Sequence, residues 1–133
     1  MSREIKFRAW EIELHEWNID YKIKLNGDVK DFDFDYDGYY EFIVPKEDYI
    51  IEQYTGLKDK NGKEIYEGDI VKARDWDGEW GKYRIKWKQS HCAFEAFKCG
   101  KYRKWNFSLT GFIDIEVIGN IHENPELLKG EKE

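Results

Sequence analysis

The sequence predicts a mainly β protein, and three features carry that prediction. Aromatic residues make up 17% of the 133 residues, and isoleucine is far more frequent than leucine. Aromatic and β-branched side chains suit a pleated, half-buried surface better than a helix. Apolar and polar residues also alternate with a period of two through much of the chain, and turn dipeptides such as Asn26-Gly27 separate the alternating segments.

The alternating segments give the expected elements in chain order. Two short helical segments interrupt them, one over residues 46–54 after Pro45 and one in the tail at residues 126–129, where Pro125 occupies the first turn. The remaining elements are strands, because their apolar residues recur at every second position. The clearest predicted strands lie at residues 5–9, 19–25, 32–36, 82–88 and 113–117.

The hairpin around Asp37-Gly38 can be assigned a register from its pattern. A three-residue loop with the glycine in a left-handed conformation pairs Phe34 with Tyr40 and Phe32 with Phe42. This register keeps the apolar face intact, so we prefer it to a two-residue loop. The other face of the hairpin is then strongly acidic, and its residues are Asp31, Asp33, Asp35 and Glu41.

Charge is divided into two blocks of opposite sign, within a chain whose formal net charge is −6. Residues 31–55 carry one lysine against eight acidic residues, whereas residues 81–105 carry eight basic residues against one glutamate. In the predicted strand 82–88, cations occupy alternate positions about 6.6 Å apart. The basic binding face expected from this block consists of Lys82, Arg84, Lys86, Lys88, Lys101, Arg103 and Lys104.

Two interpretations of the basic block remain open. Aromatic residues interleave with the cations, as in small β-barrels that bind single-stranded nucleic acid. The alternation, however, places Tyr83 and Trp87 on the face opposite the lysines, where a core would bury them. The acidic block is also an available partner, within the chain or on a second copy. We therefore favour a structural or self-association role over nucleic-acid binding.

No constellation of residues indicates catalysis or metal binding. Residues 33–38 match the first half of a calcium loop, but position twelve is Val44 instead of glutamate. Cys92 and Cys99 lack the spacing of zinc ligands. A continuous strand between them would hold the two residues about 23 Å apart, too far for a disulfide. We expect two free thiols, no metal, no cofactor and no enzymatic activity.

Membrane and export signals are not found in the sequence. No stretch approaches the roughly 18 consecutive apolar residues of a membrane span. The first ten residues alternate charged and apolar side chains and lack the apolar core of a signal peptide. We therefore expect a cytoplasmic protein that does not contact membranes.

Three blocks of sequence resemble one known family. Residues 3–10 read REIKFRAW, residues 53–71 read QYTGLKDKNGKEIYEGDIV, and residues 116–128 read EVIGNIHENPELL. In this order and spacing they resemble the YopX family of phage and prophage proteins, and the resemblance spans the whole chain. It implies an SH3-like small β-barrel in the C-terminal part. The family carries no agreed enzymatic activity, so the resemblance supplies no catalytic residues.

The expected organisation is an N-terminal β-hairpin lobe over residues 1–55, followed by the SH3-like barrel with a short helical tail over residues 56–133. The two parts can also be read as one continuous YopX-like unit. We expect a phage or prophage accessory protein that works by binding or assembly, as a homo-oligomer or with a host or phage protein. The alternatives are a nucleic-acid-binding module and an inhibitor of a host protein that acts through its acidic hairpin.

Overall fold

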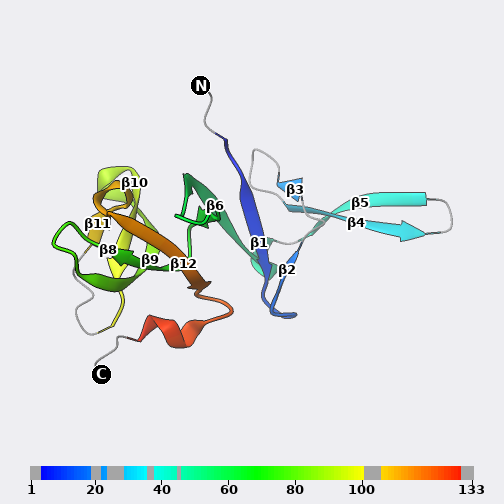
Figure 1. The fold of residues 1–133 in the computed structure, drawn as a ribbon. Coiled ribbons are helices and arrows are strands. Elements are labelled where there is room, and N and C mark those ends of the chain that lie inside the picture. The colour runs from blue at the N-terminus through cyan, green and yellow to red at the C-terminus, as the bar shows by residue number, and fades with distance from the viewer. Residues whose placement is uncertain are drawn as a thin grey trace. The chain divides into compact units, whose positions relative to one another are not determined.

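The computed structural model describes residues 4–18, 22–23, 29–35, 38–44, 46–100 and 106–129. The chain divides into two compact units, which are treated separately below (Figure 1). Residues 6–52 form the N-terminal unit, and residues 53–133 with residues 1–5 form the C-terminal unit. The division falls inside strand β6 (Tyr49–Lys58). Among the described residues, no helix is long and apolar enough to cross a membrane.

In the N-terminal unit, a short ladder is held by stacked and paired side chains. Strand β1 (Phe7–Glu11) pairs antiparallel with β2 (Glu16–Asn18). Trp10 lies opposite Trp17, and their rings meet edge to face with 5.0 Å between centroids. Arg8 stacks over the Trp17 ring at 4.2 Å and donates from Nε to Glu52 Oε1 at 3.0 Å. Glu52 is therefore buried as one half of an ion pair.

The same unit contains a three-stranded sheet whose register differs from the prediction. It consists of β3 (Lys22–Ile23), β4 (Val29–Asp35) and β5 (Gly38–Val44). Asp35 lies opposite Gly38, which leaves a two-residue connection, and Phe34 lies opposite Tyr39 instead of Tyr40. The predicted three-residue loop is therefore wrong. Short connections are the commonest in hairpins, and in the observed register aromatic and acidic positions lie opposite each other instead of on separate faces.

The new register changes the expected acidic face. The positions of Asp31, Asp33 and Asp35 share one face of the hairpin, opposite Phe42, Tyr40 and Gly38. The position of Glu41 lies opposite Phe32 and falls on the other face. The acidic face as predicted, with Glu41 beside the three aspartates, is therefore wrong in that member.

The C-terminal unit is built around a five-stranded antiparallel sheet (Figure 1). Its strand order is β11-β10-β9-β8-β12, so the last strand returns to the free edge of the first. A bulge interrupts the pairing of β12 with β8 between Val117 and Gly119. Beside this sheet, β7 (Glu64–Tyr66) pairs with the second half of β6. The strands are β8 (Asp69–Arg74), β9 (Trp80–Lys88), β10 (Ala93–Lys98), β11 (Asn106–Ser108) and β12 (Asp114–Asn120).

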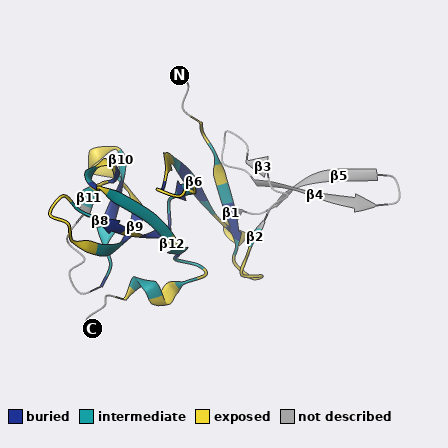
Figure 2. Cartoon of the chain, viewed as in Figure 1, coloured by how far each residue is buried: buried dark blue, intermediate teal, exposed yellow. Residues whose placement is uncertain are grey.

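One face of this sheet forms the core of the unit. Figure 2 shows buried residues on β8, β9 and β10. Tyr83 is only 2% exposed and packs against the rings of Phe107 and Phe112, 5.7 and 5.0 Å away. Burial, followed by the charges of Asp75 and Glu79, raises the pKa of Tyr83, so it remains a neutral phenol. The core cluster consists of Ile65, Val71, Ala73, Tyr83, Ile85, Ala96, Leu109 and Phe112.

The two predicted helical segments are single turns of 3₁₀ helix. After position 45 only η1 (Lys46–Asp48) is helical, and the chain then enters β6. Pairing with β1 and β7 satisfies the backbone of β6, and such tertiary pairing outweighs local preference. The tail forms η4 (Pro125–Leu128) with proline in its first turn. Two further 3₁₀ turns are η2 (Gln89–His91) and η3 (Leu109–Gly111).

Candidate binding face

A tight turn between β8 and β9 sets which side chains of β9 face outward. Asp75 Oδ1 accepts hydrogen bonds from the backbone N–H groups of Asp77 and Glu79, at 2.9 and 3.0 Å. Gly78 completes the turn with φ of +84°, which other residues adopt only with strain. From there the strand alternates as predicted, with Tyr83 and Ile85 buried in the core. The expected burial of Trp87 is wrong, because this residue near the end of β9 is 42% exposed.

The outward residues of β9 form a basic face, defined here as Lys82, Arg84, Lys86 and Lys88. Lys86 is exposed, and the other three are half-buried. None of the four forms a salt bridge with an acid in the described parts of the chain. Lys82 Nζ donates to the carbonyl oxygen of Lys129 at 3.1 Å, which ties the end of the described chain to this face. The face thus presents positive charge that the described acids do not neutralise.

Phe97 of β10 lies on the same side of the sheet, directly opposite Arg84 in the register. The Nζ atoms of Lys86 and Lys88 lie 5.0 and 5.7 Å from the centre of its ring. The apolar ring therefore has two cations as near neighbours. Of the aromatic residues that the sequence places in the basic block, Phe97 is one that shares a face with the cations.

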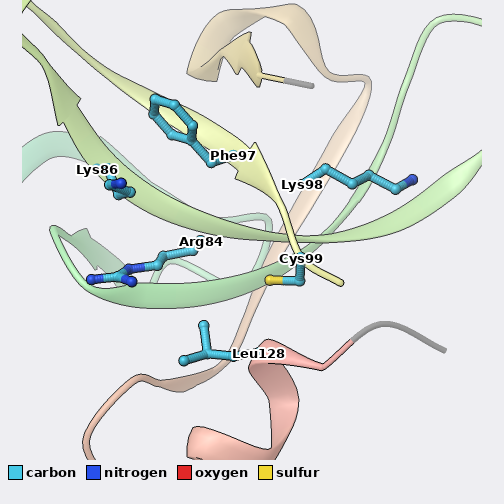
Figure 3. Close-up of a pocket in the computed structure, with 6 residues that line it drawn as sticks. All are labelled: Arg84, Lys86, Phe97, Lys98, Cys99 and Leu128. Atoms are coloured by element: carbon cyan, nitrogen blue, oxygen red, sulfur yellow. The ribbon is translucent and has the colours of Figure 1, made fainter. Parts of the chain in front are cut away.

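A cavity of about 230 Å³ opens beside Arg84. The tail supplies one wall, because the backbone N–H of Gly100 donates to the Leu128 carbonyl at 3.1 Å and fixes η4 there. The Nε atom of Arg84 is buried and has no hydrogen-bond partner. Such a donor is costly unless an acceptor reaches it, and an anion satisfies it best. Figure 3 shows the residues that line the cavity: Arg84, Lys86, Phe97, Lys98, Cys99 and Leu128.

A second aromatic ring on this face was missed by sequence analysis. Trp80 is 44% exposed and stands two residues before Lys82 in the same alternation. Lys72 Nζ lies 5.0 Å from its ring centre, and Lys60 Nζ and the guanidinium carbon of Arg74 each lie 5.7 Å away. The sequence contained the signal for Trp80, because the alternation that turns Lys82 outward also turns outward the residue two positions earlier.

Acidic side chains border the basic face on both sides. On β12, Asp114 pairs with Arg74 at 2.7 Å, and Glu116 pairs with Lys60 at 3.4 Å. On β10, Glu95 lies opposite Lys86 but is only 7% exposed, and its Oε2 lies 2.6 Å from His91 Nδ1. The positive strip therefore follows β9 and has a defined width.

The other predicted site residues have separate outcomes. Lys101, Arg103 and Lys104 lie outside the described residues, as do the side chains of the hairpin aspartates and Glu41. Neither Cys92, which is exposed, nor Cys99, which is half-buried, forms a disulfide in the described parts of the chain. Within the described ranges, no group of three or more His, Cys, Asp or Glu residues gathers as a metal site would require.

Comparison with known proteins places these features in a family context. The chain matches the model of the YopX protein family over residues 6–129. A crystal structure of protein EF1440 from Enterococcus faecalis superposes with a TM-score of 0.62 at 27% identity, covering 96% of this chain and 100% of that one. The crystal structure of yopX from Bacillus subtilis gives 0.59 at 25% identity, covering 92% and 97%. Curated protein sequences give no match.

Proposed function

Since this chain belongs to the YopX family, we propose that it is a non-enzymatic binding module of a phage or prophage, which docks an anionic partner on its basic face in the bacterial cytoplasm. One observation carries the proposal. Four cations occupy successive outward positions of β9, and none of them is paired with a described acid. The buried Nε of Arg84, which lacks an acceptor beside a cavity, supports the same conclusion.

The energetics of the face favour a partner with several charges. Like charges on neighbouring outward positions repel one another, so the face is unfavourable when it is alone. One exposed ion pair contributes only about 0.2–1 kcal/mol, and a single anionic group would gain little. A partner with anions at regular intervals engages several cations at once, and its approach is accelerated by the local positive field.

We also propose that the five-stranded sheet of the C-terminal unit is an SH3-like barrel. Its strands β8 to β11 follow one another as a meander, a 3₁₀ turn (η3) follows β11, and β12 pairs with the first strand. In this order β11 and β12 are the two edge strands of the sheet, and closure into a barrel would bring them together. Backbone nuclear Overhauser effects between β11 and β12 are expected for a closed barrel, and their absence would indicate an open sheet.

The binding proposal is tested with long-chain polyphosphate, an anion that has neither bases nor side chains. Lys86→Ser/Lys88→Ser should weaken its binding by about 2- to 30-fold, which corresponds to two exposed ion pairs. The double variant Lys58→Ser/Lys63→Ser removes the same charge from exposed positions elsewhere and serves as the matched control. An equal loss in both variants, or no salt-sensitive binding by the wild type, would refute the proposal.

Light scattering separates a second copy of the chain from other partners. If the acidic block of a neighbouring copy occupies the basic face, the wild type is an oligomer that salt dissociates, and Lys86→Ser/Lys88→Ser is a monomer at low salt. An oligomeric state unchanged by both salt and the substitutions excludes this partner.

A further inference from the structure

Building on the proposed function, on which this step rests, we infer that the anionic partner is a single-stranded nucleic acid that lies along β9 and stacks bases on Trp80 and Phe97. The two rings stand on the same side of the sheet as the basic face. Nucleic acid is the biological polyanion whose repeating unit carries both a phosphate and a flat aromatic group. A face that carries a row of cations, with one ring at its end and a second ring on the neighbouring strand, matches that unit.

The spacing along the strand supports an extended single strand. Outward side chains of β9 repeat at about 6.6 Å, and the face from Trp80 to Lys88 is about 26 Å long. That length corresponds to about four extended nucleotides, at the lower end of the site sizes found for small barrels. Phe97 lies opposite Arg84, and Trp80 lies four residues before Arg84 in β9. Four residues of strand separate the two positions by about 13 Å. The two rings are therefore far enough apart to take different bases.

The present neighbours of the rings show how a strand would be accommodated. Ammonium groups now lie over the rings, with Lys72 Nζ 5.0 Å from Trp80 and Lys86 Nζ 5.0 Å from Phe97. An exposed cation–π contact is weaker than the stacking of a base on an aromatic ring. A base would displace each ammonium group from its ring, and the ammonium group would then pair with the adjacent phosphate. The carboxylates of an acidic protein surface can pair with the ammonium groups but cannot stack on the rings.

The cavity beside Arg84 provides a place for one phosphate. Its lining combines the cationic groups of Arg84 and Lys86 with the ring of Phe97 (Figure 3). The ammonium group of Lys98 lies over Tyr83 on the other face of the sheet and does not contribute charge here. A phosphate at this point gives an acceptor to the buried Nε of Arg84 and leaves the attached base beside Phe97. Double-stranded nucleic acid keeps its bases stacked within the helix, so it would use the cations but not the rings.

The experiment compares three probes by fluorescence anisotropy: a labelled twelve-nucleotide oligothymidylate, a twelve-base-pair duplex and long-chain polyphosphate. The variant is Trp80→Ala, and its matched control is Trp76→Ala, because Trp76 is 73% exposed in the turn before β9 and does not contribute to the face. Thermal unfolding of each variant checks that it folds. Phe97→Leu is the second variant, since it keeps apolar bulk on β10 while removing the ring.

Trp80→Ala should weaken oligothymidylate binding by about 5- to 150-fold, the value expected for one stacked base. The affinity of Trp80→Ala for polyphosphate should stay within twofold of wild type. The affinity of Trp76→Ala should stay within twofold of wild type for all three probes. A plot of the logarithm of the binding constant against the logarithm of salt concentration should be less steep for Lys86→Ser/Lys88→Ser, with a slope smaller in magnitude by about 1.4. One outcome would overturn the nucleic-acid inference and leave the proposed function standing. In that outcome polyphosphate binding requires the basic face, oligothymidylate binds no more tightly than the duplex, and neither ring variant changes the affinity for oligothymidylate. Binding of none of the probes would overturn both.

Discussion

Replacing Asp59 with asparagine should destabilise the C-terminal unit, because this carboxylate joins the loop after β6 to strand β12. Asp59 is 7% exposed. Its Oδ1 accepts hydrogen bonds from the backbone N–H groups of Asn61 and Lys63, both at 2.9 Å, and Oδ2 accepts one from Val117 at 2.9 Å. An asparagine that keeps Oδ1 in place directs its amide NH₂ at the Val117 N–H, so two donors face each other.

The magnitude follows from the number of lost acceptors. Asp59→Asn leaves one buried donor without a partner, and the free energy of unfolding should fall by about 1–3 kcal/mol. Asp59→Ala removes the acceptor of all three bonds. At the same cost of about 1–3 kcal/mol for each donor, that variant should lose at least about 3 kcal/mol.

The effect should also depend on pH in a defined direction. Burial alone raises the pKa of Asp59, but the hydrogen bonds from Val117, Lys63 and Asn61 and the charge of Lys63 outweigh it, so the pKa lies below its ordinary value of 3.8. A carboxyl group with a lowered folded-state pKa stabilises the fold fully above its ordinary pKa, and the stabilisation is lost as pH falls through the folded-state value. The advantage of wild type over Asp59→Asn should be constant near neutral pH and shrink below pH 3.8.

Urea unfolding followed by tryptophan fluorescence, near neutral pH and in acid, measures both effects. Asp77→Asn makes the same chemical change in the exposed turn before β9 and should stay within about 0.5 kcal/mol of wild type. If Asp59→Asn also unfolds within about 0.5 kcal/mol of wild type at neutral pH, Asp59 does not hold the two segments together and the reasoning is refuted.

Three further predictions concern the core, a turn and the thiols. Ile85 is fully buried, so Ile85→Ala should cost about 2–5 kcal/mol in urea unfolding and Ile85→Val only about 0.5–1.5 kcal/mol, whereas equal losses would contradict close packing there. Gly78 has φ of +84° with open space around its missing side chain, so Gly78→Ala should cost only backbone strain of about 1–2 kcal/mol in thermal unfolding. A thiol reagent should modify Cys92 quickly and Cys99 slowly in the native protein, and denatured protein prepared without reductant should show two thiols; a count of zero would mean that they are bridged.

The basic face was predictable because β9 lies between two partner strands. β8 and β10 both pair with it, so Tyr83 and Ile85 are buried and the alternate positions face outward. Strict alternation in the sequence reflects that single buried face. Trp80 was missed because the predicted strand begins at Lys82, whereas β9 begins at Trp80 in the structure.

The N-terminal unit was less predictable because its pairings are set by non-local contacts. The burial of Glu52 in β6 depends on its ion pair with Arg8, 44 residues earlier in the chain. No local sequence pattern predicts such a pair. The hairpin register depended on loop length, for which apolar patterning favoured the wrong solution. Nothing in the sequence marks the position of η4 beside the basic face either, because hydrogen bonds from Gly100 and Lys82 to the tail create that arrangement.

The return of β12 to β8 has a consequence for how the protein is made. β8 is an interior strand only when β12 covers its second edge, and the paired residues Arg74 and Asp114 are 40 positions apart. While the ribosome is still synthesising the intervening residues, β8 has a row of unpaired N–H and C=O groups along one side, which is a template for pairing with other chains. A nascent or prematurely terminated chain that lacks β12 is therefore the form of this protein most exposed to aggregation, and the one that chaperones and proteases would meet.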